Sequence, residues 1–394
     1  MGGGLLQLIA VGAADVYITG NPQITYFKSV YKRHTNFAIE SIEQSFNGTT
    51  GYGKTVSATI SRNGDLIHKM YVEHQVIIGN VQTEKVHYGH NFLKEVELEI
   101  GGQTIDKHYS QWLQIWNELN EPYYKQSHIR NGYMRMVSDY PVDTAESTYR
   151  KIYVPLQFWF CRNPGLALPL IALQFHEVKV TFTFQTAANC VNSSGTFGTT
   201  NLWVDYIYLD SDERRKFAET SHQYLIEQIQ FTGVETVTQN TKKELDINFN
   251  HPIKELLWIV ATDTGTSNME FLNLAGDSDS NAEASGGSGS TGGSCKAKLL
   301  MNGTERFSER WMTYFTRVQP HQHHTNIPNG DRIGVYSFAL KPEEHQPSGT
   351  CNFSKIDNVV LEITPGATGS LYVFAVNYNI LRIMSGMAGL AYAK

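Results

Sequence analysis

A glycine-rich stretch early in the chain has the spacing of a phosphate-binding loop. Gly48, Gly53, Lys54 and Thr55 satisfy the pattern G-x-x-x-x-G-K-[ST], in which backbone amides and the lysine hold nucleotide phosphates. That loop works only where it opens a helix, whose N-terminal amides point at the phosphates. Residues 56–61 instead alternate between apolar and polar types, which predicts a strand. We therefore expect a glycine-rich turn between two antiparallel strands and no bound nucleotide.

Three histidines, His321, His323 and His324, gather in one short segment. Imidazoles can bind a transition metal, but no carboxylate or cysteine stands directly beside these in the sequence. A solvated loop is the favoured interpretation, with a metal site as the alternative. The chain has no G-x-S-x-G, H-E-x-x-H or C-x-x-C motif. We expect no catalytic, cofactor-binding or metal-binding residues, and no enzyme.

The other chemically versatile side chains favour structural roles. Glu97 and Glu99 alternate with apolar residues, as on the solvated face of a sheet. The histidines within strand-like sequence are interpreted as surface or hydrogen-bonded core residues; they are His68, His74, His87 and His90. The four cysteines are widely spaced, which favours buried thiols in a reducing compartment; they are Cys161, Cys190, Cys295 and Cys351.

Four asparagines fit the N-glycosylation pattern N-x-[ST]: Asn47, Asn192, Asn302 and Asn352. Two of them are followed by glycine, and Asn-Gly pairs are typical of turns. No signal peptide is recognisable, so host secretory glycosylation has no evident route to these residues. They are candidate glycosylation sites and nothing more specific.

Composition indicates an ordered, β-rich chain that does not coat nucleic acid. Its 394 residues suggest two or three domains, and 41% hydrophobic residues are enough for a core in each half. Aromatic residues make up 12% and favour strands. The net charge of -6 argues against direct nucleic-acid binding, which needs clustered basic residues.

The N-terminal run of residues 5–11 is apolar but far too short to span a membrane. Gly2 suggests N-myristoylation, yet Leu6 stands where that motif requires serine or threonine. We expect this segment to pack against another surface.

Three segments alternate with a period of two, which predicts strands with one buried face: residues 54–62, 94–100 and 177–184. The first ends at Asn63-Gly64, a strong hairpin signal. Longer apolar runs predict strands buried on both faces, at residues 152–160, 166–173, 202–209, 256–261 and 371–383. Helical periodicity is confined to residues 109–119 and 210–220, the second with Asp210 as its N-cap.

The two halves of the chain resemble each other. Residues 96–103 align with 297–304, and residues 204–209 align with 376–381, in the same order. Two copies of one all-β unit joined around residues 211–222 explain this pattern. Residues 275–294 are rich in glycine and serine without apolar periodicity, which predicts an exposed, mobile loop within the second unit.

Several long blocks resemble the major capsid proteins of nucleocytoplasmic large DNA viruses, above all the algal, chlorovirus-like members. In the first half these blocks are residues 2–10, 15–25, 27–28, 36–42, 61–67, 96–102, 164–173 and 203–210. In the second half they are residues 346–354 and 381–387. The resemblance covers nearly the whole chain, although residues 48–55 and 275–294 follow no pattern of the family.

The resemblance implies two consecutive eight-stranded antiparallel jelly rolls with short helices in loops. The expected division is an extended arm at residues 1–25, a first roll at 26–210, a linker helix at 211–222 and a second roll at 223–394. In the family, three chains form a pseudo-hexagonal capsomer that tiles an icosahedral shell. The partners implied are neighbouring capsomers, minor capsid and penton proteins, and the inner viral membrane through the arm. The location implied is the virion, assembled in the host cytoplasm.

Two alternatives remain. One is a minor capsid paralogue of the same fold, which only the protein composition of virions distinguishes. The other is a carbohydrate-binding β-sandwich, which explains the strand pattern and the aromatic residues but not the N-terminal block. Saturable sugar binding in a glycan screen would favour that second alternative.

Overall fold

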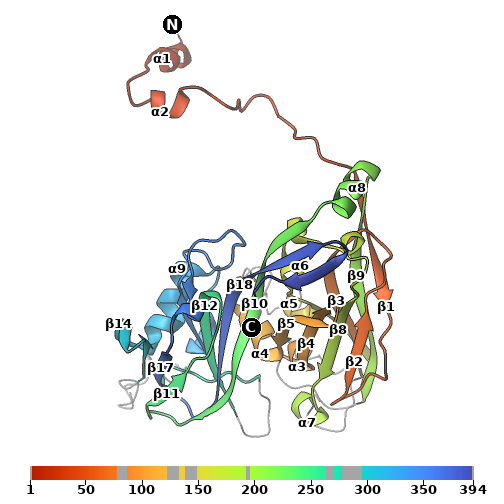
Figure 1. The fold of residues 1–394 in the computed structure, drawn as a ribbon. Coiled ribbons are helices and arrows are strands. Elements are labelled where there is room, and N and C mark those ends of the chain that lie inside the picture. Colours follow the sequence, from red (N-terminus) through yellow and green to blue (C-terminus); the bar gives the residue numbers. More distant parts are fainter. Residues whose placement is uncertain are drawn as a thin grey trace. The chain divides into compact units, whose positions relative to one another are not determined.

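The computed structural model describes residues 2–77, 87–121, 133–137, 149–191, 196–262, 269–276 and 295–392. The chain divides into two compact units, Met1–Asn36 and Phe37–Lys394. The small unit contains helices α1 (Gly3–Ile9) and α2 (Val16–Thr19). The large unit contains every strand found in the described residues, arranged in four sheets (Figure 1).

Two sheets form the first roll. One has the order β1 (Phe37–Gln44), β9 (Phe197–Leu209), β3 (Leu66–Ile77) and β6 (Tyr149–Pro155), with the short β7 (Leu168–Pro169) paired to β3. The other has the order β2 (Thr55–Thr59), β8 (Val178–Phe184), β4 (Leu93–Ile100) and β5 (Gln103–Tyr109). The pairings are antiparallel, and consecutive strands mostly alternate between the sheets, as in a jelly roll.

The second roll repeats this order strand for strand. One sheet is β10 (His222–Val237), β18 (Gly369–Met384), β12 (Pro252–Ala261) and β15 (Ile333–Ser337). The other is β11 (Lys243–Asp246), β17 (Val359–Thr364), β13 (Lys296–Met301) and β14 (Thr304–Trp311). The short β16 (Cys351–Asn352) and β19 (Met387–Leu390) extend the first of these sheets. The prediction of two eight-stranded antiparallel jelly rolls is confirmed.

Short helices lie in the connections. In the first roll they are α3 (Tyr88–Asn91), α4 (Ser110–Asn120), α5 (Tyr133–Met136), α6 (Trp159–Arg162), η1 (Pro164–Leu166), η2 (Leu170–Ala172) and α7 (Ala187–Cys190). Helix α8 (Ser211–Glu219) separates the rolls. In the second roll they are the π-helix η4 (Tyr314–Val318), α9 (Gln319–His323), η5 (Asn329–Asp331) and η6 (Phe353–Lys355). The two helices predicted at 109–119 and 210–220 are present as α4 and α8, and Asp210 caps α8.

The apolar residues of the alternating segments form the cores. Val96 and Leu98 on β4 and Val180 on β8 belong to the first core. The equivalent Ala297 and Leu299 on β13 belong to the second. The predicted repeat of residues 96–103 is therefore correct in register. The second predicted repeat aligns residues of equivalent strands, β9 and β18, but the alignment is wrong by one residue. Val204 faces the first core, whereas Val376 faces the opposite side of its sheet.

Three of the longer apolar runs differ from their prediction. Residues 152–155 on β6 alternate between buried and half-buried positions, and the run leaves the strand and enters α6 at Trp159. Strands β12 and β18 are buried on both faces, as predicted. Residues 202–209 on β9 instead alternate between buried and half-buried positions. Residues 166–173 form two 3₁₀ turns around the two-residue strand β7, because Pro169 limits a longer ladder.

Glycine-containing turns also divide into two kinds. Asn302-Gly303 joins β13 to β14 in a tight hairpin with positive φ at both residues. Asn63-Gly64 is not a hairpin turn, since β2 and β3 lie in different sheets. A Cβ on Gly64 would lie 2.9 Å from Cβ of Tyr206, so that glycine permits close packing. The loop predicted at 275–294 lies, from residue 277 onward, outside the described residues.

Candidate assembly surfaces

The two rolls of the large unit meet through a buried apolar contact. Helix α4 of the first roll packs Trp112, Ile115 and Leu119 against the outer face of the β10-β18-β12-β15 sheet. From that sheet, Leu257 and Phe374 contribute side chains that are at most 1% exposed. An amphipathic helix on a sheet is a stable two-layer arrangement. The contact explains why β12 and β18 are buried on both faces.

Polar groups fix the register of this contact. The Asp106 carboxylate on β5 accepts a hydrogen bond of 3.0 Å from the backbone N–H of Ile229 on β10. The Gln228 amide donates in return to the carbonyl of Ile105. Because a shift of one roll against the other would break both buried hydrogen bonds, such a shift is costly.

Beside the apolar contact lies a cluster of buried charges. Lys254 on β12 is fully buried and its Nζ lies 2.7 Å from Glu227 Oε1 on β10. Arg162 of the first roll lies 2.9 Å from Glu227 Oε2. Burial alone would raise the pKa of Glu227, but the charges of Arg162 and Lys254 hold that pKa well below its usual range. Glu227 thus remains ionised and ties both rolls together.

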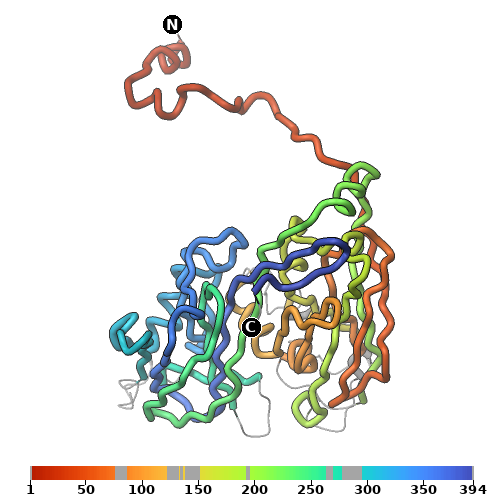
Figure 2. The backbone as a smooth tube through the Cα atoms, viewed as in Figure 1, coloured from red at the N-terminus to blue at the C-terminus, as the bar shows by residue number. Residues whose placement is uncertain are grey.

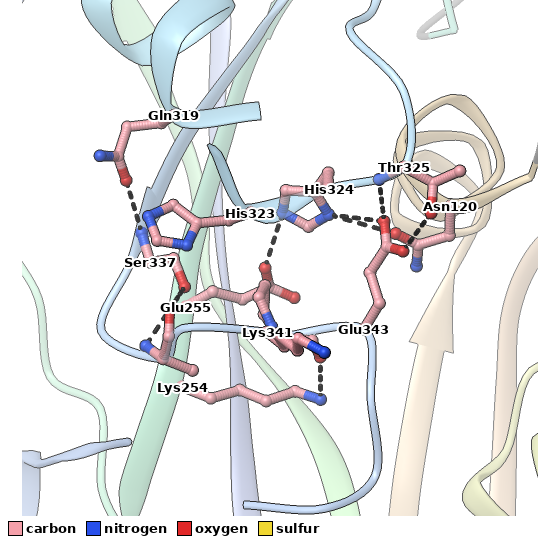
Figure 3. A network of polar contacts seen from close by, with 12 residues as sticks. Asn120, Lys254, Glu255, Gln319, His323, His324, Thr325, Ser337, Lys341 and Glu343 are labelled. Atoms are coloured by element: carbon pink, nitrogen blue, oxygen red, sulfur yellow. Dashed lines mark hydrogen bonds and ion pairs between the residues drawn. The ribbon is translucent and has the colours of Figure 1, made fainter. Parts of the chain in front are cut away.

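A second charged group, centred on His324, lies nearby (Figure 3). The His324 Nε2 lies 3.1 Å from Glu255 Oε2, and its Nδ1 lies 3.1 Å from Glu343 Oε1. The same Nδ1 lies 3.2 Å from Asn120 Oδ1 at the end of α4. Burial would lower the pKa of His324, but the charges of Glu255 and Glu343 more than offset it and raise the pKa to about 9.

The histidine segment is therefore not the solvated loop that its sequence suggested. His321 and His323 lie on α9, and the His324 side chain is only 1% exposed. Among the residues that the structure describes, no group of three or more His, Cys, Asp or Glu side chains has a metal-binding arrangement. His324 carries a buried positive charge between the carboxylates of Glu255 and Glu343.

This charge predicts a loss of stability at alkaline pH. The folded pKa of His324, about 9, lies above the ordinary value of 6.5, so its stabilisation is complete below about pH 6.5 and disappears as the pH rises through about 9. We expect the free energy of unfolding to fall by about 3 kcal/mol across this window. Urea unfolding between pH 6 and pH 10 measures it.

The matched variants are His324→Gln and His321→Gln. His324→Gln should remove the alkaline slope and be less stable at pH 6.5, because Glu255 loses its counter-charge. His321→Gln, at an exposed position of the preceding helix α9, should keep the wild-type slope. Equal slopes in the two variants would contradict the assignment.

The C-terminal hairpin returns to the first roll (Figure 2). Leu381, Ile383 and Ala388 on β18 and β19 belong to the first core, not the second. The backbone N–H of Phe175 donates to the carbonyl of Gly386 at 2.9 Å, and the N–H of Ala388 donates to the His176 ring at 3.1 Å. The last strands thus close the first roll.

Gly386 at the tip of this hairpin offers a mutational test. Its φ is +78°, and an added Cβ would lie 2.6 Å from the Phe175 ring. Gly303 has the same conformation, with φ +76°, and open space around it. We expect Gly303→Ala to cost about 1 kcal/mol from backbone strain alone, and Gly386→Ala about 2 kcal/mol. Urea unfolding of both variants checks the difference, and equal costs would show that the ring contact is unimportant.

The first roll has a sheet face that corresponds to the covered face of the second. We call the outward side of β1-β9-β3-β6 the first outer face. Its aromatic centre consists of Tyr71, Tyr153 and Trp203, with ring centroids of Tyr71 and Trp203 6.3 Å apart. On β1 the outward Phe37 and Ile39 are each 53% exposed. At its upper end this face is covered, where Ile207 packs with Phe217 of α8.

The small N-terminal unit exposes many apolar side chains. No residue of α1 or α2 is buried, and Tyr17 and Phe27 are more than 90% exposed. Within the described part of the chain, no helix combines the length and apolarity needed to cross a bilayer. Exposed apolar surface of this extent marks a contact site.

The remaining sequence candidates are scattered. Residues 48–55 connect β1 to β2, and the predicted strand follows the loop. Strands β1 and β2 lie in different sheets, but Asn47 and Ser57 form an antiparallel bridge across the loop, so the expected turn is present in part. Of the glycosylation candidates, Asn47, Asn302 and Asn352 are exposed, and Asn192 lies outside the described residues. Cys161, Cys190 and Cys295 are buried as predicted, and Cys351 is half-buried.

The buried charges around Glu227 and His324 were not predicted from the sequence. A signal for them was present in residues 252–261, where Lys254 and Glu255 interrupt an otherwise apolar strand. Two adjacent opposite charges on a strand buried on both faces require partners from neighbouring segments. His74, by contrast, is a hydrogen-bonded core histidine as predicted, with Thr200 and Tyr88 as partners and a pKa lowered to about 3 by burial.

Comparisons with known proteins agree over the whole chain. Residues 25–210 match the family model described as major capsid protein N-terminus, and residues 213–389 match that of the large eukaryotic DNA virus major capsid protein. A major capsid protein of Pyramimonas orientalis virus is 48% identical, and one of Paramecium bursaria Chlorella virus 1 is 44% identical, each over the full length of both chains. A chain of the PBCV-1 virus capsid structure matches with a TM-score of 0.79 and 38% identity, covering 94% of this chain and all of that one.

Proposed function

The chain belongs to the family of large eukaryotic DNA virus major capsid proteins, and from that premise we propose that three copies close into a pseudo-hexagonal capsomer. It is a structural protein of the viral capsid and not an enzyme, in agreement with its relatives. Three chains with two rolls each supply six similar wedges, which suit a six-cornered block. Such blocks tile the facets of an icosahedral shell with neighbouring capsomers.

The observation that carries this proposal is the rigid junction between two rolls of identical strand order. Because the junction is locked by apolar packing and by the Arg162–Glu227 pair, each chain presents its two rolls at a fixed angle. When similar rolls meet at a fixed angle and the same contact is repeated from roll to roll, the rolls can close into a ring. A flexible linker between the rolls would not define such a ring.

Light scattering of the purified protein tests the trimer. We expect a mass three times the chain's 44.4 kDa, unchanged on dilution through the micromolar range. A stable monomer at these concentrations would refute the proposal. Chemical cross-linking that ends at three chains per particle is the independent check.

The small N-terminal unit supplies contacts beyond the capsomer. Its exposed apolar side chains suit minor capsid and penton proteins or the inner viral membrane. We divide the chain functionally into an arm at residues 1–25, rolls at 26–210 and 223–394, and a linker at 211–222. Assembly in the cytoplasm of the infected host completes this proposal, and fractionation of infected cells tests it.

Among the glycosylation candidates, Asn47 is the most suitable acceptor. The side-chain oxygens of Asn302 and Asn352 accept hydrogen bonds from the backbone N–H groups of Asn358 and Ser354. Asn47 is exposed and joins β2 only through its backbone, which donates to the carbonyl of Ser57. Peptide mass spectrometry of virion protein tests for a glycan on Asn47; an unmodified peptide would refute it.

A further inference from the structure

The small unit is basic, whereas the rest of the chain is acidic. Residues 1–36 contain three basic residues, Lys28, Lys32 and Arg33, and all three are exposed. Asp15 is the only acid of this unit, so its formal charge is +2 when histidine is counted as neutral. Since the whole chain carries -6, the large unit carries -8. A charge asymmetry of this kind indicates that the basic part binds an anionic partner.

Aromatic side chains lie among these basic residues. Tyr26 and Phe27 precede Lys28, and Tyr31 precedes Lys32. Each of the three rings is more than 85% exposed. Such side chains gather where an apolar phase meets water, because the rings and the alkyl stems of lysine enter the apolar side while the charges stay hydrated. Residues 26–33 therefore have the composition of a segment that lies at a membrane surface.

Helix α1 adds aliphatic side chains to the same unit. Leu5, Leu6, Leu8 and Ile9 are each more than half exposed, and no residue of α1 is buried. The helix has only seven residues, and no helix in the described part of the chain is long and apolar enough to cross a bilayer. A helix of this length can enter only the boundary between the headgroups and the acyl chains.

Two classes of anionic partner differ in what they offer to these side chains. The phosphates of a nucleic acid would neutralise the three cations but would leave the leucines of α1 in water. A bilayer with anionic lipids offers negative headgroups to the cations and an apolar layer to the leucines and the aromatic rings. The bilayer is therefore the partner that matches both parts of the small unit.

We propose that the small unit binds the surface of membranes that contain anionic lipids. The leucines of α1 enter the boundary of the acyl chains, and Lys28, Lys32 and Arg33 contact the headgroups. This inference rests on the arm's proposed contact with the inner viral membrane, and it names the lipid class and the residues that recognise it. The three arms of one capsomer bind the same bilayer together, which raises the affinity of the capsomer above that of a single arm.

Vesicle flotation with the full-length protein tests the dependence on lipid charge. One vesicle preparation contains phosphatidylcholine alone, and the other contains equal parts of phosphatidylcholine and phosphatidylserine. We expect the protein to bind the mixed vesicles at least about tenfold more tightly, and this difference should disappear at high salt, which screens the charges. Equal binding to the two preparations, or binding to neither, would overturn the proposal.

Two triple variants assign the effect to residues. The chain with Lys28→Gln, Lys32→Gln and Arg33→Gln should bind the mixed vesicles no more tightly than pure phosphatidylcholine, a loss of at least about tenfold. The matched control neutralises three exposed basic residues of the large unit and should bind as the wild type does; its changes are Arg215→Gln, Lys216→Gln and Lys355→Gln. A similar loss in both triple variants would contradict the assignment.

The same assay tests the role of α1 and the nucleic-acid alternative. Replacing Leu5, Leu6, Leu8 and Ile9 by serine should weaken binding to both vesicle preparations, because the apolar contact does not depend on lipid charge. A DNA duplex added at the same salt concentration should not release the protein from the mixed vesicles. Release by the duplex would assign the basic residues to nucleic acid and overturn the lipid contact.

The outcomes separate this inference from the proposed function. A monomeric wild type refutes the trimer, although each arm should still bind the mixed vesicles. If shells require residues 2–22 but the wild type ignores anionic vesicles, the arm contacts proteins, and only the lipid contact is refuted.

Discussion

Glu227→Gln should destabilise the chain by about 3–5 kcal/mol, because it leaves Lys254 and Arg162 beside a neutral side chain. Lys254 is fully buried, and its only carboxylate contact in the described residues is with Glu227. A buried ammonium without a counter-charge loses hydration that nothing replaces. Urea unfolding at fixed protein concentration measures the change, since assembly alters apparent stability.

Two further variants make this test specific. Glu344→Gln removes an acid whose ion pair with Lys341 is more than half exposed, so it should change stability by less than about 0.5 kcal/mol. Replacing both partners, Glu227→Leu with Lys254→Met, should recover most of the loss, because the fully buried ammonium of Lys254 is then removed together with its counter-charge. A cost below about 1 kcal/mol for Glu227→Gln would show that water reaches the cluster. The adjoining cavity of about 240 Å³, lined in part by Arg162, Glu227 and His345, offers the route.

Deleting residues 2–22 should leave the rolls folded and abolish shell formation. The deleted helices α1 and α2 contribute no buried residue, so the unfolding temperature should change by less than about 2 °C. Their apolar side chains are exposed, and we expect them to contact other molecules. Electron microscopy of particles from cells that express only the truncated protein checks the result.

Two substituted arms serve as controls for the deletion. Replacing Leu5, Leu6, Leu8 and Ile9 by serine should reproduce the assembly defect, because it removes the apolar contact and keeps the length. Replacing Gly2, Gly3 and Gly4 by alanine keeps those side chains and should assemble normally. Normal shells from the deleted chain would mean that the rolls alone define the lattice.

The fold was largely predictable because jelly-roll strands bury one face. Period-two alternation identifies β2, β4 and β8, and apolar runs identify β12 and β18. Local turn chemistry was a weaker guide. Asn302-Gly303 and Asn63-Gly64 look alike in sequence, yet only the first joins paired strands. Which sheet a strand joins depends on long-range packing that the turn does not encode.

The assembly surfaces were less predictable for a related reason. His324 looked solvated because its carboxylate partners, Glu255 and Glu343, are distant in the sequence. Trp203 lies in an apolar run that resembles a strand buried on both faces, although its side chain belongs to the half-exposed outer face. A sequence pattern shows how apolar a strand is. It does not show whether residues of the same chain or of another chain pack against the strand's apolar face.

The contribution of Leu381, Ile383 and Ala388 to the first core has a consequence for protein synthesis. The ribosome releases these residues after nearly all of the second roll, so the roll that is translated first stays unsealed until the second has been made. Prematurely terminated chains keep an open hydrophobic core and are exposed to chaperones and proteases. A chain that stops before residue 381 therefore lacks part of the core of its first roll as well as the end of its second.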